Sequence, residues 1–244
     1  MSLLHFPPGP HSAGQRERTP AAALHPGPGR LVKDAPTRVA HAGMALSFLV
    51  AYLTAEGEAW RLWHVIAGYV LLLALAFRLA WAVVGPPSAR FTAWWLRLRA
   101  GWQWLAAHRH RAVWQEWRRQ PAARLRQALA QLSQMVIPTL LVLSLAAGLS
   151  GWFVEFDWAS ESMAEWHDAL GNALLVVVLL HLALLLTRSL WQRQNLMAVM
   201  WSGRLPGRGP DLVPSHRSGL AWALALSLIA FAAWYWWQAQ ASLL

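Results

Sequence analysis

Long apolar runs constrain the fold of this chain more than any other feature of its sequence. A helix needs roughly 20 predominantly apolar residues to cross the hydrocarbon core of a bilayer, and five runs approach or reach that length. They cover residues 39–55, 62–84, 135–154, 169–187 and 220–238. Of the 244 residues, 57% are hydrophobic and only 13% are charged, which excludes an ordinary soluble domain. The sequence therefore predicts an all-α integral membrane helical bundle.

The composition divides the chain into three parts. Residues 1–33 are rich in proline, glycine and alanine and have no apolar periodicity, which predicts a disordered N-terminal tail. Residues 34–207 contain the first four spans. Residues 208–244 contain a short linker and the last span. We expect a four-helix core domain with an additional C-terminal transmembrane helix.

The placement of charge predicts the orientation. Of 21 lysine and arginine residues, only Arg61 lies in the loops that follow the first and third spans. The acidic residues of those loops are Glu56, Glu58, Glu155, Asp157, Glu161 and Glu165. Because cytoplasmic loops carry the excess of lysine and arginine, we expect a multi-pass protein with a cytoplasmic N-terminus. The net charge of +10 then reflects topology, and the Arg/Trp-rich segment 86–126 suits the surface of an anionic membrane. We expect membrane lipid as a partner and no nucleic acid.

Four histidines lie on the apolar spans, namely His41, His64, His167 and His181. Ionisable residues inside such spans are costly and indicate function, although any single one can simply hydrogen-bond to a neighbouring helix. His167 and His181 are fourteen residues apart, which puts both imidazoles on one face, about 21 Å apart along the helix. By depth, His41 lies level with His181 and His64 level with His167. The sequence predicts these two pairs.

Paired imidazoles predict a cofactor held by histidine. The chain has no cysteine, which excludes a covalently attached c-type haem and a cysteine-ligated iron–sulfur cluster. Two histidines facing across a bundle suit a haem better than a tetrahedral zinc site. Gly68 and Gly171 each follow a proposed ligand by four residues, so they share its face and leave space for a porphyrin edge. With both axial positions of the iron filled, such a haem carries electrons and does not bind oxygen.

Arg78 is the deepest cation on these spans. It lies fourteen residues after His64, on the same helical face. Two interpretations stay open. The guanidinium can extend to the water at the membrane surface, or it can pair with an anionic group such as a haem propionate.

Several short motifs in this order resemble a known family. They are Pro36-Thr37-Arg38 before His41, Trp63-His64 with Gly68 and the later Phe77-Arg78, Ala89-Arg90-Phe91, His167 with Asn172 and His181, and Asn195, Met200, Gly203 and Arg204 at the close. Residues 33–207 thus resemble the bacterial cytochrome b561 family, in the group related to the cytochrome b subunit of nickel–iron hydrogenases. The segment 126–134 lacks the Gly-His-Asn-Pro-like stretch of many relatives.

The resemblance implies two non-covalent haem b groups, with His41, His64, His167 and His181 as the iron ligands. It also implies quinone as a membrane substrate. The predicted function is that of an electron-transfer subunit in the bacterial inner membrane, between the quinone pool and a periplasmic redox protein such as a cytochrome c or a hydrogenase subunit. The alternatives are a self-contained quinone or ferric reductase and a transporter that uses its histidines. A nicotinamide- or flavin-driven reductase would need a nucleotide-binding unit, and no G-x-G-x-x-G motif occurs.

Overall fold

The computed structural model describes residues 29–108, 115, 118–156, 161–207 and 209–241. Nearly all of them are helical, so the predicted all-α class is confirmed. The α-helices are α1 (Ala35–Leu53), α2 (Arg61–Val84), α3 (Phe91–Ala107), α5 (Pro121–Glu155), α6 (Glu161–Gln192), α7 (Ala198–Ser202) and α8 (Ser218–Ala241). Two 3₁₀ turns, η1 (Glu58–Trp60) and η2 (Pro87–Ala89), and two short strands, β1 (Arg30–Leu31) and β2 (Arg204–Leu205), complete the described elements.

Four of the described helices are long and apolar enough to cross a membrane. They are α2 with η1, α5, α6 and α8, and they contain the last four predicted spans. The first predicted span forms α1, which does not belong to this set, because Arg38, His41 and Ser47 interrupt its apolar side chains. At 1.5 Å per residue its 19 residues still extend about 28 Å, close to the thickness of a hydrocarbon core.

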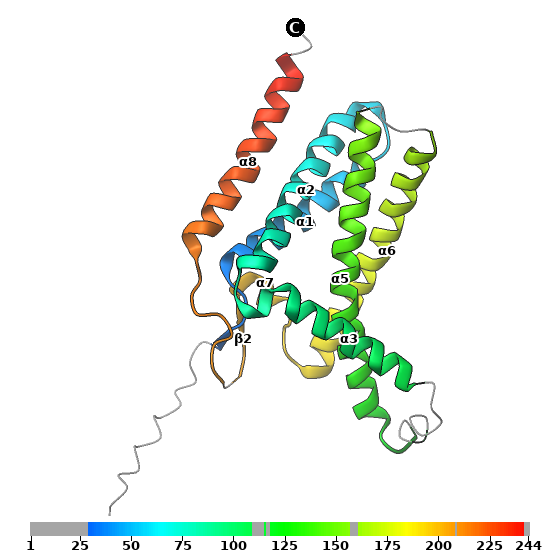
Figure 1. Cartoon of the computed structure of the whole chain (residues 1–244), viewed down its shortest axis with the longest axis vertical. Helices are drawn as coiled ribbons and strands as arrows, with labels where there is room; N and C mark the ends of the chain where they lie inside the picture. The colour runs from blue at the N-terminus through cyan, green and yellow to red at the C-terminus, as the bar shows by residue number, and fades with distance from the viewer. Residues whose placement is uncertain (1–28, 109–114, 116–117, 157–160, 208, 242–244) are drawn as a thin grey trace, which may run out of the picture.

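The core of the bundle consists of two helical hairpins. Helix α1 packs along α2, α5 packs along α6, and α2 contacts α5 (Figure 1). The contact between the hairpins depends on Gly148, where a Cβ atom would collide with the side chain of Leu72. This glycine therefore permits the close approach of α2 and α5, as small residues at helix interfaces commonly do.

Helix α8 packs against the first hairpin. Leu224 and Leu228 are buried against Ala40 of α1 and Ala74 of α2. Gly43 of α1 makes room for this contact, since a Cβ atom there would lie 3.0 Å from Leu228 Cδ1. The C-terminal span is thus packed into the bundle at the side of α1 and α2.

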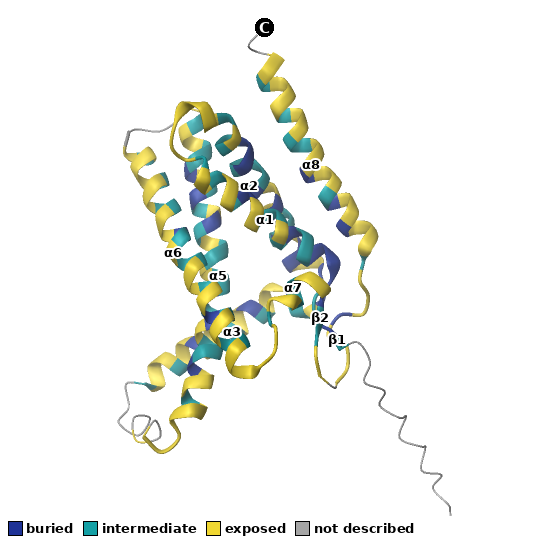
Figure 2. Cartoon of the chain, turned by 180° about the vertical axis from the view of Figure 1, so that it is seen from behind, coloured by how far each residue is buried: buried dark blue, intermediate teal, exposed yellow. Residues whose placement is uncertain are grey.

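Large apolar side chains cover the outer faces of the long helices. Val176 is 65% exposed, Leu226 is 62% exposed and Trp237 is 68% exposed, and the exposed faces of α6 and α8 are visible in Figure 2. Exposure of so large an apolar surface to water would be unfavourable, whereas lipid tails solvate it. These faces and the four apolar helices describe a multi-pass membrane protein.

The two ends of the bundle differ in charge. At the acidic end, defined here by Glu56, Glu58, Glu155 and Glu165, α1 leads into α2 and α5 leads toward α6. At the basic end, defined by Lys33, Arg38, Arg78 and Arg97, α3 extends across the bundle and packs on α5 (Figure 1).

Chain segments far apart in sequence join at the basic end. Strand β1 pairs antiparallel with β2, with Arg30 opposite Leu205. The Leu31 amide donates to Asp211 Oδ1 at 2.6 Å, and the Ala35 amide donates to the His216 carbonyl at 3.0 Å. Most of the predicted tail, residues 1–28, lies outside the described residues, but its last residues are tied to the segment that precedes α8.

Candidate functional site

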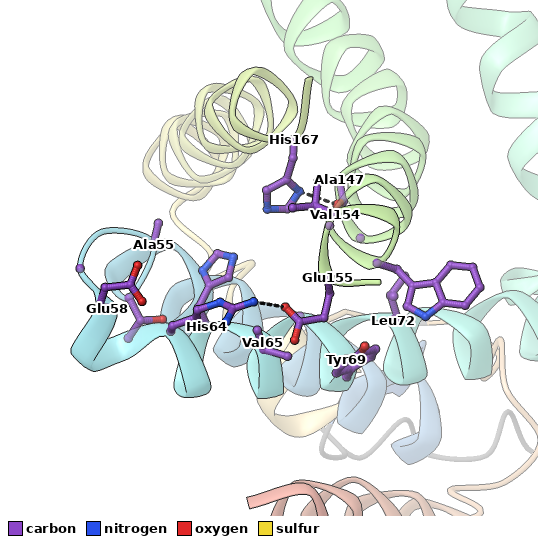
Figure 3. A pocket seen from close by; sticks show the side chains of 17 residues that line it. Ala55, Glu58, His64, Val65, Tyr69, Leu72, Ala147, Val154, Glu155 and His167 are labelled. Atoms are coloured by element: carbon purple, nitrogen blue, oxygen red, sulfur yellow. Dashed lines mark hydrogen bonds and ion pairs between the residues drawn. The ribbon is translucent and has the colours of Figure 1, made fainter. Parts of the chain in front are cut away.

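His64 of α2 and His167 of α6 face each other at the acidic end. Their ring centroids lie 5.8 Å apart and the ring planes are nearly perpendicular, at 87° (Figure 3). Imidazole nitrogen binds a metal ion at about 2 Å, so this separation leaves room for one ion between the two rings. The structure thus brings together one of the two pairs that depth alone predicts.

Each ring is oriented by a backbone carbonyl of the neighbouring helix. His64 Nδ1 lies 2.8 Å from the Ala51 carbonyl oxygen, and His167 Nδ1 lies 3.0 Å from the Ala147 carbonyl oxygen. Ala51 belongs to the last turn of α1, where carbonyls lack helical partners. Because a carbonyl only accepts, each Nδ1 donates its proton, which leaves the lone pair on Nε2. This is the arrangement that histidine ligands of metals commonly adopt.

A cavity of about 400 Å³ lies beside the two rings. Besides His64 and His167, its lining includes Gly68, Tyr69 and Leu72. A Cβ atom added at Gly68 or at Gly171 would meet nothing within 4 Å. Of the two glycines that the sequence singled out, Gly68 therefore lines the cavity, and Gly171 adjoins open space without belonging to the cavity lining.

Gly151 of α5 has a role at this site that sequence reasoning missed. A Cβ atom there would lie 2.8 Å from His167 Cε1, so a larger residue would collide with the imidazole in its present position. The sequence shows Gly151 merely as a small residue on a span without histidine. Helical periodicity does not reveal which side chain of the next helix it contacts.

The two imidazoles of His64 and His167 fit an iron whose other ligands come from a cofactor. Within the described parts of the chain, no group of three or more histidine, cysteine, aspartate or glutamate side chains gathers around one point. Two imidazoles alone hold a free divalent ion poorly, because zinc sites need three or four protein ligands. They suffice for haem, whose porphyrin supplies the remaining ligands.

An ion pair between Arg61 and Glu155 forms part of the cavity lining. Arg61 Nη2 lies 2.9 Å from Glu155 Oε2, and both residues belong to the cavity lining together with Glu58. The side chain of Arg61 is 63% exposed, so the pair contributes little to stability. It joins the start of α2 to the end of α5 beside the histidines.

His41 of α1 and His181 of α6 form the second predicted pair, at the basic end. The two imidazoles lie close enough to interact electrostatically, and the charge of Lys33 also acts on His41. Both rings are half-buried. Neither makes a hydrogen bond or ring contact with another residue that the structure describes, so this pair lacks the carbonyl contacts that orient His64 and His167.

Arg78 is held inside the protein. Its side chain is 8% exposed, and Nη1 and Nη2 donate to the Ala89 carbonyl at 3.3 Å and 3.4 Å. Its Cζ atom lies 4.4 Å from the centre of the Trp94 ring, a distance typical of cation–π contact. The guanidinium therefore fastens η2 and α3 to α2.

These features define an all-α membrane protein in which His64 and His167 face each other at one end of the bundle and His41 and His181 interact at the other. Comparison with protein families gives a match to the prokaryotic cytochrome b561 family over residues 32–203, and the chain belongs to this family. The resemblance read from the motifs is thereby confirmed. The protein is a membrane b-type cytochrome of electron transfer, and its family binds haem b. Helix α8 lies outside the matched residues. Neither the curated proteins nor the solved structures contain a match.

Proposed function

We propose that this protein carries electrons across the bacterial inner membrane through two haem b groups. The electrons pass between the quinone pool and a periplasmic redox protein such as a cytochrome c or a hydrogenase subunit. The proposal rests on one observation: the rings of His64 and His167 face each other, and each Nδ1 bonds to a backbone carbonyl. This geometry prepares both Nε2 atoms for one shared iron.

In this proposal each residue of the two pairs has a defined role. His64 and His167 hold the outer haem, and Gly68 and Gly171 leave space for its edge. His41 and His181 hold the inner haem, and Arg78 faces one of its propionates. Haem supplies reversible one-electron oxidation and reduction. Apolar side chains surround the imidazoles, and the two levels lie about 21 Å apart.

The proposed orientation follows from charge. The basic end faces the cytoplasm and the acidic end faces the periplasm, since lysine and arginine concentrate on the cytoplasmic side. Residues 34–207 form the haem-binding domain, and residues 208–244 form the linker and additional helix. Electrons thus cross from one membrane face to the other by passing between the haems held by the two histidine pairs.

Histidine substitutions test the haem count and the pairing together. The pyridine haemochrome assay should give two haems per fully loaded chain, both released by denaturant. His64→Ala and His167→Ala should remove the same component in a redox titration, and His41→Ala and His181→Ala the other. His216→Ala, an exposed histidine outside the helices, is the matched control.

Two results would contradict the proposal. If His41→Ala and His181→Ala removed different spectral components, the pairing by depth would be wrong. A purified protein without the sharp bands of reduced haem would instead favour the histidine-using transporter.

A further inference from the structure

Three cations and one carboxylate gather at the basic end from three separate segments. Lys33 and Asp34 precede α1, Arg78 lies on α2, and Arg97 lies on α3. Asp34 is completely buried and Arg78 is 8% exposed. The charges of Asp34 and Arg97 both act on Arg78. The four side chains therefore form one electrostatic cluster beneath the surface, which we name the basic cluster.

The carboxylate of Asp34 is already engaged by neutral donors. Its Oδ1 accepts from the Thr37 amide at 3.3 Å, which caps the start of α1. Its Oδ2 accepts from Trp81 Nε1 at 2.9 Å. The structure describes no ion pair between Asp34 and any of the three cations. Asp34 thus balances part of their charge from a distance and leaves their donors available.

The cations of the basic cluster have more donors than acceptors. Lysine carries three N–H donors and arginine five. Lys33 and Arg97 make no side-chain hydrogen bond within the described chain, and Arg78 uses its guanidinium on a single carbonyl. Burial and the charges of Arg97 and Arg78 lower the pKa of Lys33 to about 8, against the opposing effect of Asp34. Buried charge of this kind is costly unless an anion compensates it.

The depth of the basic cluster indicates which anion it accepts. Arg78 lies six residues before the end of α2, and His41 lies six residues after the start of α1. At the helical rise both are about 9 Å inside the bundle. The charge of Lys33 reaches His41. A lipid phosphate would lie further out, at the membrane surface, whereas the carboxylates of a haem held by His41 would be near this level.

We propose that Lys33, Arg78 and Arg97 together bind the two carboxylates of the inner haem, with Asp34 as their fixed counter-charge. This inference rests on the proposed function, because it requires a haem at His41 and His181. It adds Lys33 and Arg97 to a site at which the sequence indicated only Arg78. The donors of Lys33 and Arg97 gain charged acceptors, and their positive charge stabilises the reduced haem.

The first experiment measures potentials in the haem-loaded protein. Lys33→Met and Arg97→Met should each lower the midpoint potential of the component that His41→Ala removes, and leave the outer component unchanged. Arg99→Met is the matched control, since Arg99 is an exposed cation two residues further along α3. Lys33→Arg keeps the charge and should keep the potential, which separates loss of charge from loss of folding.

The second experiment measures recognition of the carboxylates. Protein stripped of haem is reloaded with haem b or with its dimethyl ester, whose acids carry no charge. The inner site should prefer haem b by tenfold or more, as loss of charge-assisted hydrogen bonds implies. Lys33→Met and Arg97→Met should each reduce that preference, and Arg99→Met should not.

Three results would overturn the inference, and they are distinguishable. Equal binding of haem and ester, with unchanged potentials, would show that the basic cluster does not contact the carboxylates. Loss of tightly bound phosphorus from purified Lys33→Met and Arg97→Met would assign the cations to a lipid phosphate. If His41→Ala removed no spectral component, the proposed inner haem itself would be absent.

Discussion

The two ends of the bundle hold their histidine pairs by different means. At the acidic end, His64 and His167 face each other at 5.8 Å and each is fixed by a carbonyl of the adjacent helix. At the basic end, His41 and His181 have no such bonds among the residues described, and the charge of Lys33 acts on His41. The acidic end thus sets the geometry of its ligands in advance, whereas the basic end supplies charge.

The cause of this difference lies in the packing of the helices. Each ring at the acidic end lies inside a close hairpin, so that Ala51 of α1 orients His64 and Ala147 of α5 orients His167. His41 and His181 belong to the same two hairpins, α1–α2 and α5–α6, but neither ring bonds to a carbonyl of the partner helix among the residues described. Helices α1 and α6 are joined by a hydrogen bond between the Tyr52 hydroxyl and Asn172 Oδ1 at 3.4 Å, which lies toward the acidic end. Preorganisation of a site thus follows from whether a ring meets a backbone carbonyl of the partner helix in its hairpin.

The largest effect is expected from Gly151→Ala. The added Cβ atom would lie 2.8 Å from His167 Cε1 and 3.1 Å from Nδ1, and the carbonyl contact prevents the ring from turning away freely. We expect the haem content to fall from two toward one per chain, with the inner component retained. Gly219→Ala, where a Cβ atom meets nothing within 4 Å, is the control. Full loading of Gly151→Ala would show that the acidic end is not preorganised in this way.

A smaller effect is expected from Arg78→Leu at the basic end. Loss of a nearby positive charge disfavours the added electron, so the potential of the inner haem should fall by an amount on the order of 1 kcal/mol. Arg78→Lys retains the charge and should recover most of the potential, although it loses the contacts with Ala89 and Trp94. A normal potential with normal haem content in Arg78→Leu would show that Arg78 only holds α3 against α2 and does not act on the haem.

The smallest effect concerns the surface of the acidic end. Glu56, Glu58 and Glu165 are exposed there, and we expect them to attract a partner with a basic docking face. Neutralising all three to glutamine should lower the second-order rate of electron transfer a few-fold at low salt and flatten its salt dependence. Stopped-flow measurements at several ionic strengths test this. An unchanged rate and salt slope would leave these charges with a role in membrane orientation alone.

In this protein the sequence predicts well how deep a residue lies in the membrane and which face of its helix it occupies. The positions of His64 and His167 near the ends of two apolar runs were enough to pair them, and the family followed from short motifs around the histidines. Periodicity carries this information because an apolar run fixes how far each residue lies from the membrane surface.

Contacts between helices could not be predicted in the same way. Nothing in the sequence assigns Gly151 to His167, Trp81 to Asp34 or Arg78 to Trp94, because each depends on the rotation of one helix against another. The pairing of β1 with β2 joins strands of two residues from distant segments, which is too short for a strand pattern. The weaker apolar character of α1 was legible in the sequence, since Arg38 and His41 lie within it.

The joining of β1 to β2 also bears on the order in which the two ends mature during synthesis. A chain emerges from its N-terminus, and all residues that orient His64 and His167 have been made once α6 is complete. The basic end must wait longer, because Leu31 and Ala35 take their backbone partners from Arg204, Leu212 and His216. Lys33 and Asp34 lie between these contacts. The acidic end can therefore assemble first, and the basic end closes only after the segment that precedes α8 has been made.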